Sequence, residues 1–251
     1  MTLVRDPDHP TDLAPGAAAD LAPGARADLA ADLAPGVRAD LAADVPADPY
    51  TIALRDGGAL YLRRHGRRRQ RLELSRWCAE PDAADDTMLA RCTGPTLDIG
   101  CGPGRLAAAL GRRGVAALGV DPVPAAVARA LAAGATALCR SVFEPLPGEG
   151  RWAAALLADG NIGIGGDPGR LLDRVHGLLA PGGLLVVETD PQDVHERFAA
   201  RVENDRGGRS SAFRWARVGT PALRTLARAH RFTMTDAWAG PNRTFAALSR
   251  A

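Results

Sequence analysis

The chain contains no lysine, and all 31 of its basic residues are arginine. This absence excludes enzymes that form a Schiff base through a lysine and phosphate-binding loops that need a lysine. Aromatic residues are also scarce, with 4 Trp, 2 Tyr and 5 Phe in 251 residues, whereas 46% of the residues are hydrophobic. We therefore expect a core built mainly from Leu, Val and Ala, in one catalytic domain with additional segments.

Cysteine is rare too, with four residues and no C-x-x-C pair, so the spacing predicts neither a disulfide framework nor a zinc site. The sequence has no apolar run of about 18 residues that could span a membrane. The start, MTLVRDPDHPTD, lacks the basic residues and apolar stretch of a secretory signal. We expect a cytoplasmic protein with reduced thiols, no metal and no membrane partner.

Residues 1–48 are repetitive and of low complexity, because the pentapeptide DLAPG occurs at Asp12, Asp20 and Asp32. The proline and glycine of each repeat interrupt any helix before it reaches the roughly 12 to 15 residues that a stable isolated helix needs. We therefore predict a disordered tail. A helix that forms on a partner and a misassigned translation start are the alternatives.

Residues 49–93 are predicted to form a small N-terminal cap, made of a β-hairpin and a helix. The alternating runs ALYLRR and QRLELSRW, joined by HGRRR, favour the hairpin, and a helix is expected from about Asp82 to Arg91. The arginine-rich run from Arg63 to Arg71 could bind phosphate groups. We favour a solvated hairpin tip, because the aromatic residues lie outside this run and do not alternate with the arginines.

Residues 94–251 alternate short apolar strands with helices. Five strands are expected in TLDIG, VAALGVD, ATALCRSVF, WAAALLAD and LLVVETD. This alternation predicts an α/β fold, doubly wound, with a mostly parallel sheet covered on both faces. The last two strands, FTMTDAWAG and RTFAALSR, are separated only by PN and must form an antiparallel C-terminal hairpin. Residues 193–219 form an insertion before a helix that starts near Thr220.

The stretch TLDIGCGPGRL follows one strand and opens a helix, at the edge of the sheet where such folds bind ligands. Gly100, Gly102 and Gly104 would let the backbone approach a ligand closely. An NAD-binding turn requires G-x-G-x-x-G, and the bulk of Arg105 at the sixth position would disturb the close packing of helix on strand. Asp98 would repel a pyrophosphate but would pair well with an ammonium group.

Asp121 ends the next strand, 17 positions after Gly104. A carboxylate at this position can accept hydrogen bonds from both hydroxyls of a ribose. A ligand with an ammonium at one end and a ribose at the other describes S-adenosylmethionine, which we expect as the cofactor.

These motifs resemble those of the class I S-adenosylmethionine-dependent methyltransferases, over about residues 93–250. The resemblance implies a seven-stranded sheet in the order 3-2-1-4-5-7-6, with the seventh strand antiparallel. It also implies a set of cofactor-binding residues. They are Asp98, Gly100, Cys101, Gly102, Gly104, Asp121, Pro122, Ser141, Val142, Asp159 and Gly160.

Methyl transfer from a sulfonium is an in-line displacement, in which the protein mainly positions the reactants and excludes water. A general base is needed only when the acceptor is protonated at the working pH. Candidates after the fourth and fifth strands are Asp159, Asp190 and His195, with Asn161 and Glu188 beside them. The alternatives are an exposed histidine in a surface turn and, for Asp190, a residue that ends a strand or caps a helix.

The acceptor pocket is expected under the cap and the insertion, with Asn161, Trp77 and Trp215 as candidate substrate contacts. Alternatively, the aromatic residues form the cores of two small subdomains. The sequence DGNIGIGG stands where family members that methylate adenine or amide nitrogens have an N-P-P-Y type sequence, which favours a small-molecule acceptor over nucleic acid. A nucleic-acid methyltransferase and a noncatalytic nucleotide-cofactor-binding protein remain the alternatives.

Overall fold

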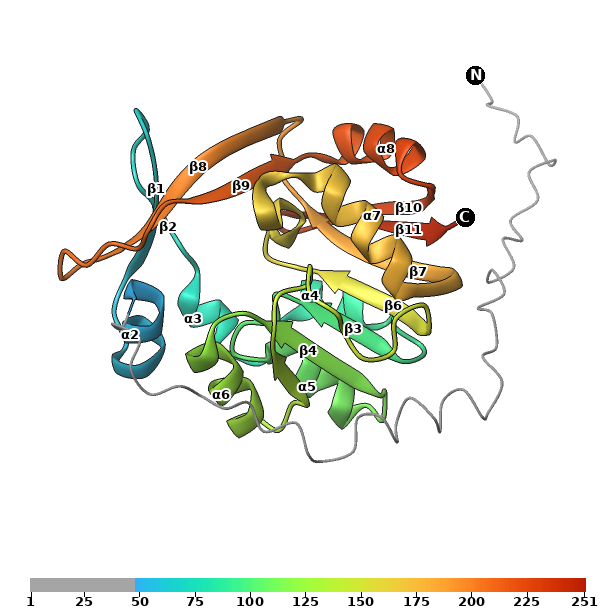
Figure 1. Cartoon of the computed structure of the whole chain (residues 1–251), viewed down its shortest axis with the longest axis horizontal. Coiled ribbons are helices and arrows are strands. Elements are labelled where there is room, and N and C mark those ends of the chain that lie inside the picture. The colour runs from blue at the N-terminus through green and yellow to red at the C-terminus, as the bar shows by residue number, and fades with distance from the viewer. Residues whose placement is uncertain (1–47) are drawn as a thin grey trace, which may run out of the picture.

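The computed structural model describes residues 48–251, whose strands form one sheet of seven strands and one of four (Figure 1). The predicted tail, residues 1–48, lies outside the described residues except for Asp48. In chain order, the strands of the larger sheet are β3 Thr96–Ile99, β4 Ala117–Asp121, β5 Ala137–Cys139, β6 Trp152–Leu157, β7 Leu179–Thr189, β10 Phe232–Gly240 and β11 Arg243–Arg250.

The spatial order of these strands is β10-β11-β7-β6-β3-β4-β5. When the strands are numbered within this sheet alone and read from the β5 edge, the order is 3-2-1-4-5-7-6, which confirms the expected topology. The five strands from β3 to β7 are parallel to one another. Strand β11 is antiparallel to both β7 and β10, which confirms the predicted C-terminal hairpin.

Helices cover both faces of the seven-stranded sheet. Successive side chains of a strand point to opposite faces, so neighbouring residues of one strand pack against different helices. On β6, Leu157 belongs to the core cluster that contains α7 and α8, whereas Leu156 belongs to the cluster that contains α4 and α5. Helix α6 packs beside α5 through small apolar residues. The helices are α4 Ala83–Leu89, α5 Arg105–Arg112, α6 Pro124–Ala132, α7 Pro168–Leu178 and α8 Thr220–Ala229.

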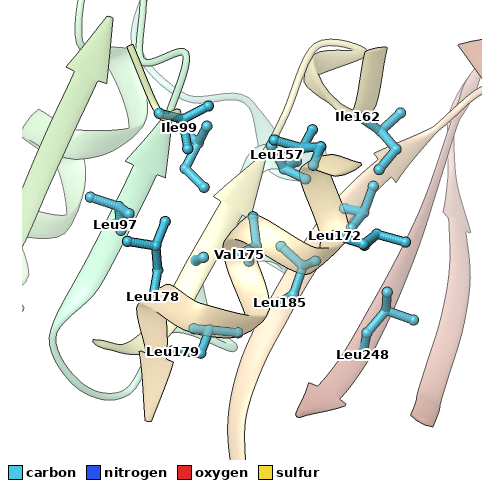
Figure 2. Close-up of a cluster of buried hydrophobic side chains, with 14 of the residues drawn as sticks. Leu97, Ile99, Leu157, Ile162, Leu172, Val175, Leu178, Leu179, Leu185 and Leu248 are labelled. Atoms are coloured by element: carbon cyan, nitrogen blue, oxygen red, sulfur yellow. The ribbon is translucent and has the colours of Figure 1, made fainter. Parts of the chain in front are cut away.

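Helix α7 shows how the sequence builds this core. Asp167 caps the helix, since its carboxylate accepts hydrogen bonds from the backbone N–H groups of the first turn. The apolar face of α7 carries Leu172, Val175 and Leu178, which lie against Leu157 and Leu185 of the strands beneath (Figure 2). All five side chains are 0% exposed. Both the capping residue and the apolar stripe are local sequence signals of a helix.

The second sheet joins the cap to the insertion, and we call it the roof sheet. Its order is β2-β1-β8-β9, and all of its strand pairs are antiparallel. Leu62 of the cap pairs with Val202 of the insertion. Two segments far apart in the sequence therefore form one sheet at the side of the molecule (Figure 1). Its strands are β1 Leu60–Arg64, β2 Gln70–Arg71, β8 His195–Asn204 and β9 Phe213–Val218.

The cap differs from its predicted structure in two places. The second hairpin strand, predicted to run through QRLELSRW, ends at Arg71, because the chain leaves β1 there and turns into the short helix α3 Leu74–Trp77. Helix α2 Pro49–Asp56 was not predicted, although Asp48 caps it through both Tyr50 and Thr51. The helix expected from Asp82 is confirmed as α4, which begins with a capping box at that residue. Between residues 48 and 251, no helix is long and apolar enough to cross a membrane.

Candidate functional site

The glycine-rich turn after β3 requires glycine for two separate reasons. Gly100, Gly102 and Gly104 have φ angles of 71°, 54° and 89°, which disfavour any other residue. A Cβ at Gly100 would lie 2.7 Å from the amide nitrogen of Asn161, so this glycine permits the contact between two loops. A Cβ at Gly104 would lie 2.7 Å from the Cα of Ala130, so that glycine permits α5 and α6 to pack closely.

A cavity of about 840 Å³ opens above this turn, between the carboxyl ends of the parallel strands and the roof sheet. Most of the predicted site residues line it. They are Asp98, Gly100, Cys101, Gly102, Asp121, Pro122, Ser141, Val142, Asp159, Gly160, Asn161, Trp77, Trp215 and Asp190. Gly104 is buried against Ala130 of α6 and does not line the cavity. His195 lies on the exposed side of β8, outside the cavity.

Asp121 ends β4 and lies buried in the cavity wall. One of its carboxylate oxygens accepts a hydrogen bond from the Gly102 N–H at 3.0 Å, and the other accepts from the Val123 N–H at 2.9 Å. Burial raises the pKa of the carboxyl, and these two hydrogen bonds oppose that rise. Each oxygen keeps a second lone pair, so the fixed carboxylate can still accept from two hydroxyl groups.

Asp98 on β3 is 2% exposed, and its Oδ2 atom has no hydrogen-bond partner among the residues that the structure describes. Burial, reinforced by the negative charge of Asp159, raises the pKa of Asp98 to about 7. A buried charged acceptor without a partner is costly, so it needs a donor or a cation. A ligand ammonium would satisfy this carboxylate, so the residues present fit the amino-acid end of S-adenosylmethionine.

Asp159 follows β6 in a left-handed conformation, with φ 55°. Its carboxylate pairs with Arg105 at 2.7 Å and with Arg76 at 2.6 Å. Arg105 also pairs with Asp85, whose side chain is 0% exposed. The sequence suggested that the bulk of Arg105 would disturb the packing of α5 on the sheet. Instead, the guanidinium lies between two carboxylates and connects the cap helix α4 to the cavity wall.

The acidic residues at the end of β7 are paired in the same way. Asp190 forms a bidentate ion pair with Arg217 of the roof sheet, with N–O distances of 2.6 and 3.0 Å. Both oxygens of Glu188 accept from Arg243 of β11, at 2.9 and 2.8 Å, and one of them also accepts from the backbone N–H of Asp159. The Asp190–Arg217 pair therefore joins the end of β7 to the roof sheet, and the Glu188–Arg243 pair joins β7 to β11.

Asn161 opens the 3-10 helix η1 Asn161–Gly166. Its side-chain amide donates to the carbonyls of Ile99 and Gly100, both at 2.9 Å. The loop after β6 is thereby attached to the glycine-rich turn, and the two loops form a continuous floor.

Sequence reasoning missed many of the residues that line the cavity, among them Arg76 of α3, Leu62 of β1 and Phe198 of β8. Arg76 stands beside the candidate Trp77, but the prediction of a strand there gave no indication of its direction. Tyr50 of α2 contacts Trp77 edge to face, with ring centroids 6.2 Å apart, and burial raises the pKa of its hydroxyl. Tyr50, Leu62 and Arg76 show that the cap supplies one wall of the cavity.

The family model of a methyltransferase domain matches residues 62–231, well over half of the chain. A search of curated proteins found no match. Among solved structures, a methyltransferase from Bacteroides fragilis, in complex with S-adenosylhomocysteine, is similar with a TM-score of 0.70 and 19% identity, over 82% of this chain and 97% of the other.

Two further structures share the fold. An N1-methyltransferase for 1,6-didemethyltoxoflavin from Burkholderia thailandensis has a TM-score of 0.51 and 24% identity, over 67% of this chain and 79% of the other. The sugar N-methyltransferase KedS8 from Streptoalloteichus has a TM-score of 0.52 and 17% identity, over 71% of this chain and 89% of the other. The chain therefore belongs to the class I methyltransferases that use S-adenosylmethionine.

Proposed function

We propose that the protein transfers a methyl group to a small molecule bound between the cofactor and the roof sheet. The observation that carries this proposal is the shared cavity. The same space of about 840 Å³ is lined both by Asp98 and Asp121 of the seven-stranded sheet and by Phe213 and Trp215 of β9 in the roof sheet. Its volume lies within the roughly 300 to 1,000 Å³ that is usual for small-molecule pockets.

The roof sheet contributes an aromatic wall to this cavity, formed by Phe198, Phe213 and Trp215. Phe198 lies opposite Trp215 in the strand register, so both side chains point to the same face of the sheet. Phe213 and Trp215 contact each other edge to face, with ring centroids 5.9 Å apart. We infer that this wall holds an apolar part of the acceptor and helps to exclude water from the methyl group.

We propose that the acidic residues around the cavity position its walls, instead of taking a proton from the acceptor. Asp159, Glu188 and Asp190 already accept hydrogen bonds from arginine side chains. His195 lies outside the cavity. When bound, S-adenosylmethionine supplies the activated methyl group, so the acceptor needs only a lone pair that is free at the working pH. A neutral amine or an ionised phenol meets this condition.

Two proteins of the same fold also act on small molecules. The Burkholderia thailandensis enzyme was crystallised with 1,6-didemethyltoxoflavin, and KedS8 methylates a sugar. The shared fold of these two proteins supports a small-molecule acceptor.

The test is a panel of small amines, phenols and sugars, assayed with S-adenosylmethionine that carries a labelled methyl group. Once an acceptor is found, the variants Phe213→Ala and Trp215→Ala should lower transfer by about tenfold or more. They should leave the affinity for S-adenosylhomocysteine within about twofold, because only the acceptor contacts the aromatic wall. Ala199→Ser, on the exposed face of β8, is the matched control. Full transfer by both aromatic variants would contradict the proposal.

The alternative, a nucleic-acid acceptor, depends on the exposed arginines of the β1–β2 hairpin. Part of this run is used within the protein, since Arg64 pairs with Glu196 and Arg69 lies over the Tyr61 ring. Arg67 and Arg68 are exposed. We expect no binding of a labelled RNA or DNA at low salt. Tight, salt-dependent binding that is lost in a double Arg67→Gln, Arg68→Gln variant would support this alternative.

A further inference from the structure

Arg76 of α3 carries a buried donor that no residue between 48 and 251 satisfies. Its Nη2 atom pairs with Asp159 at 2.6 Å, whereas its Nη1 atom is buried and has no hydrogen-bond partner. The side chain lines the cavity. Because a guanidinium holds its donors in a rigid fork, a second acceptor must come from whatever occupies the cavity.

The unpartnered acceptor of Asp98 lies in the same part of the cavity. Asp159 connects the two groups, since it pairs with Arg76 and its charge acts on Asp98. Among residues 48–251, the cavity-lining atoms that are buried without a hydrogen-bond partner include Arg76 Nη1, a cationic donor, and Asp98 Oδ2, an anionic acceptor. Two other charged lining residues with such atoms, Arg105 and Asp159, already pair with each other. A ligand that satisfies both Arg76 and Asp98 must carry a negative and a positive group close together, as the α-amino acid end of S-adenosylmethionine does.

We propose that Arg76 binds the α-carboxylate of S-adenosylmethionine while Asp98 binds its ammonium group. Arg76 belongs to the cap, outside the strand-turn-helix segment that carries the family's cofactor motif. The cap then takes part in cofactor binding as well as in covering the acceptor. This inference concerns the cofactor alone and does not depend on the identity of the acceptor.

A purely structural Arg76, which serves only to neutralise Asp159, makes a different prediction. Its loss would disturb the cavity for every ligand, with or without a carboxylate. Binding of three ligands separates the two roles. S-adenosylhomocysteine has the whole amino acid, its decarboxylated form lacks only the carboxylate, and 5′-methylthioadenosine lacks both charged groups.

We would measure the three affinities by calorimetry in the full-length protein. The wild type should bind S-adenosylhomocysteine at least about tenfold more tightly than the decarboxylated ligand. Arg76→Gln should weaken S-adenosylhomocysteine by about 10- to 100-fold and leave the other two ligands within about twofold. The matched control, Arg63→Gln, changes an exposed arginine of the same cap and should leave all three affinities unchanged.

Equal weakening of all three ligands in Arg76→Gln would assign a structural role and overturn the proposal. Unchanged binding of S-adenosylhomocysteine in that variant would overturn it as well. The wild type provides a test that needs no folded variant, because equal affinity for S-adenosylhomocysteine and its decarboxylated form would show that no protein group binds the carboxylate.

Discussion

The parallel strands at the centre of the seven-stranded sheet are buried on both faces, whereas the roof sheet has one face on the cavity and the other in solvent. In the first sheet, the last four residues of β6 are all buried. In the roof sheet, β8 alternates between exposed residues such as Arg197 and half-buried residues such as Phe198. The first pattern stabilises the fold. The second pattern leaves one face of the roof sheet able to contact a ligand. We therefore infer that the seven-stranded sheet mainly stabilises the fold and that the roof sheet mainly contributes to ligand recognition.

The largest expected effect comes from the same substitution made in both sheets. Leu157→Ala on β6 removes a side chain that is 0% exposed, and it should lower the free energy of unfolding by about 2 to 5 kcal/mol. Leu62→Ala on β1 removes a half-buried side chain of the cavity wall and should cost about 1 kcal/mol. Urea denaturation of both variants checks this. Equal losses would show that the roof sheet is part of the main core.

A smaller effect concerns the pH dependence of cofactor binding. Asp98 has a pKa of about 7, so below that pH it must lose a proton before it can pair with an ammonium. The affinity for S-adenosylhomocysteine should therefore fall by up to about tenfold per pH unit below pH 7 and level off above it.

Calorimetry in buffers of different ionisation enthalpy checks the same prediction, because binding near pH 6 should release close to one proton, about 0.9 for a pKa of 7. Asp98→Asn should bind more weakly at pH 8, with no dependence on pH in this range. An unchanged pH profile in that variant would assign the titration to another group.

The smallest expected effect is at the join between cap and insertion. Arg64 of β1 pairs with Glu196 of β8 at 2.9 Å, and its guanidinium lies 3.7 Å from the centre of the Phe198 ring. Arg64→Met keeps most of the apolar contact and should cost less than about 1 kcal/mol, with a difference that shrinks in high salt. Thermal melting at low and high salt measures it. A loss of several kcal/mol would mean that this pair holds the roof sheet together.

The contrast between the sheets also explains what the sequence could predict. The turn after β3 and the acid at the end of β4 lie within one short segment, and their geometry follows from local rules of strand, turn and helix. Asp98 and Asp121 could therefore be assigned to one ligand before the fold was known. Asp167 and the apolar stripe of α7 were predictable for the same reason.

The roof sheet was not predictable in this way, because its central pairing joins Leu62 to Val202 and no local pattern records such a distant partner. The ion pairs show the same limit. Arg105 looked like an obstacle to packing until Asp85 and Asp159 were placed on either side of it. Arg76 could not be found at all while its segment was assigned to a strand.

We propose that this chain binds S-adenosylmethionine through Asp121, the residue that ends β4. This proposal is tested most directly by calorimetric titration of S-adenosylhomocysteine into the wild type and Asp121→Ala, with Asp236→Ala as a control outside the cavity. Asp121→Ala should bind roughly 10- to 100-fold more weakly, because one or two charge-assisted hydrogen bonds to the ribose are lost. The control should bind as the wild type does. Unchanged affinity in Asp121→Ala would contradict the account.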